Sequence, residues 1–148
     1  MGRLWCSLYI SGHKTEKLVT TGPYSITRNP LYFFSLIGAF GVGLASETLV
    51  IPAVVLLGFA IYYPRVIKAE EKRLLKIHAE QFDNYVARTP RFFPKWSLLI
   101  EPKNYVVHPA RFRKDILSAL WFIWLIGVLE IIEGIHEAGI VVPIFTLY

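Results

Sequence analysis

The sixteen lysines and arginines of this 148-residue chain are confined to two segments, 1–28 and 65–114. The stretch 29–64 and the stretch after Asp115 contain no basic residue, and both are strongly apolar. Basic residues that collect on one side of apolar stretches are typical of membrane proteins, because cytoplasmic loops retain Lys and Arg. The pattern predicts an all-α, polytopic membrane protein with both basic segments on the cytoplasmic side, which in a bacterium means the inner membrane.

The composition supports this class. The chain has the length of one domain, and 54% of its residues are hydrophobic and 15% aromatic. We interpret the net charge of +5 as topology and attraction to anionic lipid, because the sequence contains no arginine-rich helix or zinc pattern that would indicate nucleic-acid binding. The single cysteine, Cys6, excludes an internal disulfide and a cysteine-cluster metal site. We therefore predict no metal site and no nucleic-acid partner.

The apolar stretches divide this single domain into four segments. Asn29 is expected to cap the first membrane helix with its side-chain oxygen, and Pro30 suits the first helical position. A return helix is expected to end near Ile67 after a bend at Pro64. The predicted segments are a cytoplasmic loop (1–29), a transmembrane helical hairpin (30–67), a cytoplasmic amphipathic helix and loop (68–114) and a C-terminal membrane segment (115–148).

The cytoplasmic helix is predicted over 68–88. Its apolar stripe recurs at three- and four-residue spacing, at Leu74, Leu75, His78, Phe82, Tyr85 and Val86. We expect this stripe to pack on the membrane or on the protein itself, with His78 as a packed side chain and not as a ligand or base.

Two other groups of residues have a simple structural interpretation. Small residues at every fourth position (Ser35, Ala39 and Gly43) form a helix face that a neighbouring helix, or a second subunit of a homo-oligomer, could approach closely. The far end of the last segment carries a carboxylate and histidine cluster, Glu130, Glu133, His136 and Glu137. Intramembrane ionisable groups are often functional, but at this depth the cluster should reach interfacial water.

The segment 17–32 carries the strongest functional signal, because it is a polar loop that leads directly into a membrane helix. It contains a turn at Gly22, two tyrosines and Arg28. Free N–H groups at a helix start, a guanidinium group and aromatic faces suit a small zwitterionic or anionic ligand at the membrane surface. A topogenic loop is the alternative, with Arg28 anchoring a helix end and Tyr24 and Tyr32 in an aromatic belt.

The order of residues favours a ligand site over a topogenic loop. Leu-Val-x-x-Gly-x-Tyr (18–24) is followed by Arg-Asn-Pro-x-Tyr (28–32). A second block contains Glu70-Glu71, Leu74, Phe82-x-x-Tyr85 and Thr-Pro-Arg-Phe-Phe-Pro (89–94). Together the two blocks resemble the isoprenylcysteine carboxyl methyltransferase and phospholipid methyltransferase family of integral membrane enzymes.

This resemblance implies a donor, an acceptor and an N-terminal difference. The donor is S-adenosylmethionine, which would enter from the cytoplasm. The acceptor would be lipid-soluble, similar to an isoprenylcysteine carboxylate or a phospholipid amine, and would arrive laterally from the bilayer. Relatives usually carry further transmembrane helices ahead of this region, so we expect a chain that is short, or starts late, at its N-terminus.

The resemblance also assigns candidate residues. Arg28 is the candidate for the donor carboxylate or an acidic acceptor, Glu71 for the donor ammonium group or for orienting the acceptor, and Arg65 for placing the substrate; these are the predicted catalytic residues. The predicted cofactor-binding residues are Leu18, Val19, Gly22, Tyr24, Asn29, Tyr32 and Glu70. Two positions depart from the family pattern, because Asn29 is often histidine in the carboxyl methyltransferases and a usual Phe-Gly pair is here His78-Ala79.

Two alternative functions are weighed against this one. Sterol-reductase-like enzymes that use NADPH share an Arg-x-Pro-x-Tyr junction, but they usually continue with Gly-Glu, where this chain has Phe33, Phe34 and Ser35. A non-catalytic, truncated relative would fit an N-terminus that lacks helices, but not the polar residues retained in both blocks. The sequence therefore favours the methyltransferase.

Overall fold

The computed structural model describes residues 1–10, 17–46, 48–104, 107 and 109–137, and over these residues it is helical without a strand. The predicted all-α class is therefore confirmed. The elements in chain order are α1 (Gly2–Ile10), α2 (Pro23–Ile26), α3 (Pro30–Leu44), α4 (Val50–Arg88), the short 3-10 helix η1 (Trp96–Leu98) and α5 (Pro109–Glu137).

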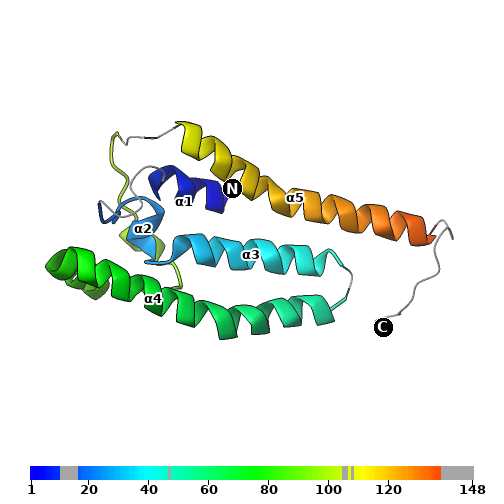
Figure 1. The fold of residues 1–148 in the computed structure, drawn as a ribbon, viewed down its shortest axis with the longest axis horizontal. Coiled ribbons are helices and arrows are strands. Elements are labelled where there is room, and N and C mark those ends of the chain that lie inside the picture. Colours follow the sequence, from blue (N-terminus) through cyan, green and yellow to red (C-terminus); the bar gives the residue numbers. More distant parts are fainter. Residues whose placement is uncertain (11–16, 47, 105–106, 108, 138–148) are drawn as a thin grey trace.

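The three long helices lie roughly side by side, with α3 between α4 and α5 (Figure 1). α3 and the first part of α4 run antiparallel and pack on each other, while α1 packs against both α3 and α5. α5 begins at Pro109, earlier than the predicted boundary at 115, so its first turns lie in the predicted cytoplasmic loop. Residues 138–148 of the predicted C-terminal segment lie outside the described residues.

Among the described helices, α4 alone is long and apolar enough to cross a membrane. Only 11% of its most apolar window is buried inside the protein, which distinguishes it from the core helix of a soluble domain. α3, with 15 residues, is shorter, and α5 contains a shorter apolar stretch, Ile123–Ile132. Large apolar side chains such as Leu57 and Trp124 are more than half exposed, as expected for surfaces that face lipid.

The predicted division of the 50–88 region into two helices is wrong. α4 continues through Pro64 and past Ile67. Residues 65–78 are mostly Lys, Arg, Glu, Leu and Ala, which are strong helix formers, so nothing local ends the helix there. The interruption lies instead at Ala79, whose backbone has φ 33° and ψ −109°.

The interruption at Ala79 folds the end of α4 back towards the N-terminal half of the chain (Figure 1). Phe82 and Tyr85 are buried as a result, with 4% and 8% of their surfaces exposed. Most of the predicted stripe is buried or half-buried, but Leu75 is 43% exposed. A positive φ is costly for any residue with a Cβ atom, so these contacts must stabilise the folded-back segment.

The small-residue face of α3 is used within the chain. Ser35 is buried and accepts a hydrogen bond from the guanidinium group of Arg3 on α1. A Cβ atom at Gly43 would lie 3.1 Å from the Cα of Pro52 on α4. Two of the three predicted small residues therefore allow close approach of neighbouring elements of the same chain.

The core next to the polar loop is formed by α1 and α2. Cys6, Tyr9 and Tyr24 are buried there, and Val19 and Phe34 pack around them. Gly22 has φ 61°, and a Cβ atom at this position would lie 2.3 Å from the ring of Tyr9. Glycine is needed at position 22 both for its backbone conformation and for this close approach.

Candidate active site

Hydrogen bonds join the two sequence blocks directly to each other. The first block, 26–29, lies along the proline-rich loop at 90–95. Four bonds join them: Arg28 N donates to Pro90 O (2.9 Å), Thr27 Oγ1 to Phe92 O (3.0 Å), Asn29 Nδ2 to Arg91 O (2.8 Å) and Lys95 N to Ile26 O (2.9 Å). Residues more than sixty positions apart are thereby held in register.

The bond from Asn29 corrects one prediction. Its side chain does not cap α3, although Pro30 does occupy the first turn as expected. Asn29 is 6% exposed, and its side-chain Nδ2 donates to the carbonyl of Arg91. A buried amide group is costly unless it forms a hydrogen bond. For Asn29 the partner is the carbonyl of Arg91 in the distant loop at 90–95.

Further bonds hold α2 from its other side. Gly22 N donates to the carbonyl of Ile100 (2.7 Å), and Ile100 N donates to Ser25 Oγ (2.9 Å). The hydroxyl of Tyr85 donates to the carbonyl of Tyr24 over 2.6 Å, in a buried position. The folded-back end of α4 therefore fixes the backbone that carries Tyr24.

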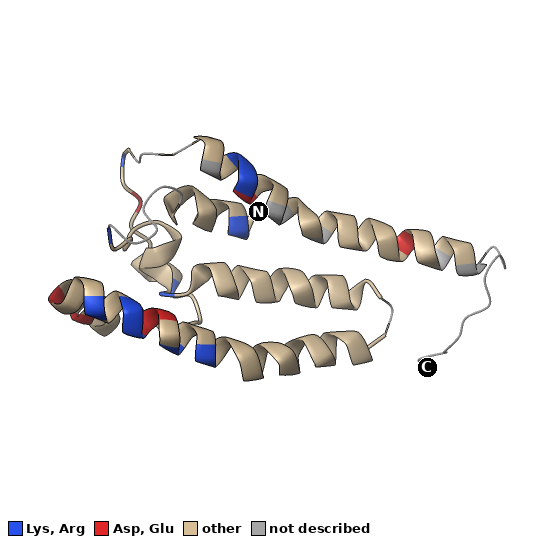
Figure 2. Ribbon diagram, viewed as in Figure 1, with Lys and Arg blue, Asp and Glu red and all other residues tan. Residues whose placement is uncertain are grey.

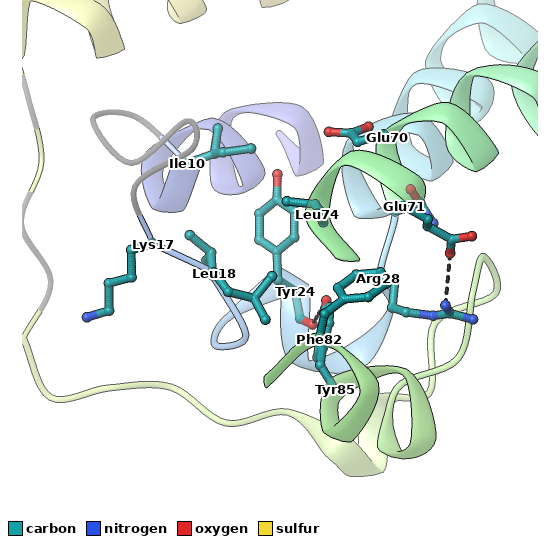
Figure 3. A pocket seen from close by; sticks show the side chains of 12 residues that line it. Ile10, Lys17, Leu18, Tyr24, Arg28, Glu70, Glu71, Leu74, Phe82 and Tyr85 are labelled. Carbon is teal, nitrogen blue, oxygen red and sulfur yellow. Dashed lines mark hydrogen bonds and ion pairs between the residues drawn. The ribbon is translucent and has the colours of Figure 1, made fainter. Parts of the chain in front are cut away.

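These segments enclose a cleft between α1, α2 and α4 (Figure 3). Its empty volume is about 610 Å³ when the open mouth is included, but only about 70 Å³ is open to the centre of a water molecule. Seven predicted site residues line it, together with five that were not assigned to the site. The lining residues are Ile10, Lys17, Leu18, Val19, Tyr24, Arg28, Asn29, Glu70, Glu71, Leu74, Phe82 and Tyr85.

Glu71 is held between two arginines. Its Oε1 atom lies 2.8 Å from Arg28 Nη1, and its Oε2 atom lies 2.9 Å from Arg91 Nη2. The side chains of Arg28 and Glu71 are only 14% and 20% exposed, whereas that of Arg91 is 41% exposed. Charge-assisted hydrogen bonds of this kind are about twice as strong as neutral ones. This three-residue group has a net charge of +1, and two of its members, Arg28 and Glu71, line the cleft.

Two buried hydrogen-bonding atoms in the cleft have no partner among the described residues. They are the hydroxyl of Tyr24, which points towards Ile10 and Leu74 (Figure 3), and Nε of Arg28. Buried polar atoms are nearly always paired, so such atoms mark places where a ligand can bind. The cleft therefore offers two unused donors close to charged groups.

Burial sets the protonation of the two phenols. It raises the pKa of Tyr24 well above its ordinary value, and nearby phenols and Glu70 act in the same direction. Burial also raises the pKa of Tyr85, although Arg28 opposes this shift. Both phenols are therefore neutral near pH 7 and can donate hydrogen bonds, but neither can act as a base there.

Three predicted residues do not line the cleft. Gly22 packs against Tyr9 and shapes the turn. Tyr32 donates from its hydroxyl to Glu70 Oε2 (2.9 Å) and so orients a residue that does line it. Arg65 is exposed, and its guanidinium group donates to the carbonyl of Ile61 on its own helix, so the structure does not bring it to the cleft.

The sequence also contained signals for residues that were missed. Phe82, Tyr85 and Arg91 all belong to the second block, of which only Glu70 and Glu71 were predicted to belong to the site. The three-residue spacing of Phe82 and Tyr85 places them on one helix face. Only the interruption at Ala79 turns that face into the cleft.

Comparison with known proteins agrees with the first block and with the beginning of the second, Glu70 to Leu74. The family model described as phospholipid methyltransferase matches residues 5–81. That match covers more than half of the chain, and the chain belongs to the phospholipid methyltransferase family.

The chain is also similar to two curated proteins. It is 44% identical over 147 residues to the cobalt-zinc-cadmium resistance protein CzcN of Cupriavidus metallidurans. It is 43% identical over 138 residues to the nickel-cobalt-cadmium resistance protein NccN of Alcaligenes xylosoxydans xylosoxydans. These alignments cover 99% and 93% of this chain but only 68% and 64% of the two relatives. No solved structure matches the chain significantly.

Proposed function

We propose that this chain is an S-adenosylmethionine-dependent methyltransferase of the membrane that methylates a lipid-soluble acceptor. Membership of the phospholipid methyltransferase family supports the reaction class. The observation that carries the proposal is the convergence of both sequence blocks on one cleft, which contains a carboxylate between two arginines and two unused buried donors.

The groups in the cleft match the chemistry of the donor. Arg28 Nε and the Tyr24 hydroxyl are free to bind its carboxylate, and the Glu70 carboxylate can accept from its ammonium group. Aromatic faces attract a sulfonium cation, and Phe82 and Tyr85 line the same cleft.

The bound donor supplies a methyl group that its positive sulfur already activates for displacement. The residues of the chain have to align this group with the acceptor and exclude water. The Arg28–Glu71–Arg91 group contributes to the alignment, because it fixes α4 relative to the loops. Leu18, Val19 and Leu74 help to exclude water, because their apolar side chains line the cleft.

We place the donor side in the cytoplasm and the acceptor in the bilayer. Lys and Arg gather at the end of the molecule where the cleft lies, while α3 and residues 50–64 of α4 carry none (Figure 2). That distribution follows the positive-inside rule. The family match gives no support to a reductase that uses NADPH. The titration described below distinguishes the methyltransferase from a non-catalytic relative, which would bind neither S-adenosylhomocysteine nor NADPH.

The names of the two relatives lead to a second, linked proposal. We propose that methylation of a membrane component contributes to tolerance of metal ions such as cobalt or cadmium. The support is the similarity to proteins named for such resistance. A deletion strain should regain tolerance with the wild-type gene but not with Glu71→Gln; equal complementation by both would contradict this link.

Calorimetric titration of the detergent-purified protein with S-adenosylhomocysteine tests the donor site. We expect micromolar binding that weakens in Tyr24→Phe and Arg28→Ala. Arg88→Ala is the matched control, because Arg88 is an exposed arginine at the end of α4 and does not line the cleft. Folded protein that binds neither this compound nor NADPH would contradict the proposed activity.

A further inference from the structure

A second hollow lies beside the cleft and shares one lining residue with it, Tyr85. It has a volume of about 270 Å³ and is formed by the chain before α2, by α2, by the folded-back end of α4 and by the chain at η1. Leu98 and Ile100 supply the apolar part of its wall. The other lining residues carry hydroxyl, amide or guanidinium groups, and no carboxylate is among the described residues that line the hollow.

The polar groups come mainly from one face of the folded-back segment of α4. Gln81, Asn84 and Arg88 are spaced at i, i+3 and i+7, so they lie on the same side of the helix. The two acidic residues of this segment, Glu80 and Asp83, do not line the hollow. This face therefore brings two amide groups and one positive charge to the hollow.

Most of these polar groups have no hydrogen-bond partner within the described part of the chain. They are the hydroxyls of Thr20 and Thr89, the amides of Gln81 and Asn84, and the guanidinium group of Arg88. Buried polar groups are nearly always hydrogen-bonded. Thr89 is only 6% exposed, so its unused hydroxyl indicates a place where a ligand can bind.

The remaining polar residues fix the walls of the hollow. Ser25 Oγ donates to the carbonyl of Gly22 over 2.7 Å and accepts from Ile100 N over 2.9 Å. The hydroxyl of Tyr85 donates to the carbonyl of Tyr24 over 2.6 Å. A ligand has to break none of these bonds, so binding requires little ordering of the protein.

We propose that this hollow binds a small organic phosphate. The phosphate group would pair with Arg88, because guanidinium groups form bidentate bonds with phosphate, and its organic part would lie against Leu98 and Ile100. A phosphate monoester offers three acceptor oxygens, which suits several separate donors without a carboxylate among them. A free phosphate ester and the head group of a phospholipid share this chemistry. The assignment is independent of the proposed methyltransferase activity.

Calorimetric titration of the detergent-purified full chain with sn-glycerol 3-phosphate tests the site, with glycerol as the uncharged comparison. We expect submillimolar binding of the phosphate ester and no measurable binding of glycerol. Arg88→Gln should weaken the binding about tenfold or more, as for the loss of a hydrogen bond to a charged group. Thr89→Val, which removes a hydroxyl at nearly constant volume, should weaken it to a smaller extent. Glycerol that binds as well as its phosphate would overturn the proposal.

Arg73→Gln is the matched control, because Arg73 is an exposed arginine on α4 that does not line the hollow. Arg88→Gln should keep the wild-type affinity for S-adenosylhomocysteine, because Arg88 does not line the cleft. Folded wild-type protein that does not bind the phosphate ester, an equal loss in Arg73→Gln, or a parallel loss of S-adenosylhomocysteine affinity in Arg88→Gln would each contradict the site. Phosphate binding that depends on Arg88 in a protein that fails to bind S-adenosylhomocysteine would uphold the site and remove only the methyltransferase proposal.

Nanodiscs separate the two sources of the phosphate. The same titration is made with the protein in phosphatidylcholine and in phosphatidylglycerol. Weaker apparent binding of glycerol 3-phosphate in phosphatidylglycerol, lost in Arg88→Gln, would assign the hollow to a lipid head group. Equal binding in both lipids would assign it to a free phosphate ester.

Discussion

The cleft and an apolar groove between α3 and α4 share the Glu71–Arg91 ion pair, but they are assembled in different ways. Eight of the nine residues that line the groove, all except Leu36, come from the stretch 56–67 of α4 and from the loop positions 91 and 92. The cleft draws on α1, α2, α4 and the connecting loop, and its walls are joined by hydrogen bonds over more than sixty residues. The groove should therefore tolerate single polar substitutions, whereas the cleft should not.

The largest effect is expected from removal of the shared carboxylate. Glu71→Gln leaves Arg28 and Arg91 without a negative partner in a partly buried position. We expect a loss of about 1–3 kcal/mol in the free energy of unfolding and at least tenfold weaker binding of S-adenosylhomocysteine. Chemical denaturation and calorimetry would measure these two effects. Glu80→Gln, an exposed change on the same helix, should alter neither, and an equal effect there would show that the ion pairs are not the cause.

A smaller effect should follow from Tyr85→Phe. The change removes the buried bond to the Tyr24 carbonyl while the ring remains in place. The expected cost is about 1–2 kcal/mol of unfolding free energy, because the carbonyl loses its buried partner. Tyr62→Phe, at a position that is 64% exposed, is the control. An unchanged denaturation midpoint for Tyr85→Phe would mean that the folded-back segment does not hold α2.

Ala79→Gly should stabilise the protein. Ala79 has a positive φ, which glycine adopts without steric cost. Relief of this strain should raise the unfolding free energy by up to about 1 kcal/mol, even though glycine also gains freedom in the unfolded chain. Ala79→Val should have the opposite sign. Destabilisation by glycine in a thermal melt would contradict the strained conformation at this residue.

The pH dependence of stability is the subtlest expectation. Because burial raises the pKa of both Tyr24 and Tyr85 in the folded protein, these groups stabilise the fold below the ordinary tyrosine pKa of about 10. That contribution is lost as pH rises from there through the raised values. The free energy of unfolding should therefore be insensitive to these two groups at pH 7–9 and fall above about pH 10. Tyr24→Phe should flatten part of that fall, and a curve that keeps its full slope would contradict the assignment.

Local sequence patterns determined much of this protein. The separation of apolar and basic segments predicted an all-helical chain, and the ordered blocks predicted both the family and seven residues of the cleft. The turn at Gly22 was also predicted, and its positive φ agrees with that part of the prediction. Such features depend on residues that are adjacent in sequence or repeat at helical spacing, so they are visible before folding.

Only the tertiary structure decided how the blocks meet. The local sequence favours Pro64 over Ala79 as the interruption of α4, because proline lacks a backbone N–H. The positive φ at Ala79 is instead accompanied by the burial of Phe82 and Tyr85 on the folded-back segment. In the same way, the side chain of Asn29 bonds to the carbonyl of Arg91 instead of capping α3, and Glu71 pairs with Arg28 and Arg91, which only the fold brings together. A hydrogen bond or ion pair selects its partner by distance in space, and that distance exists only once the chain has folded.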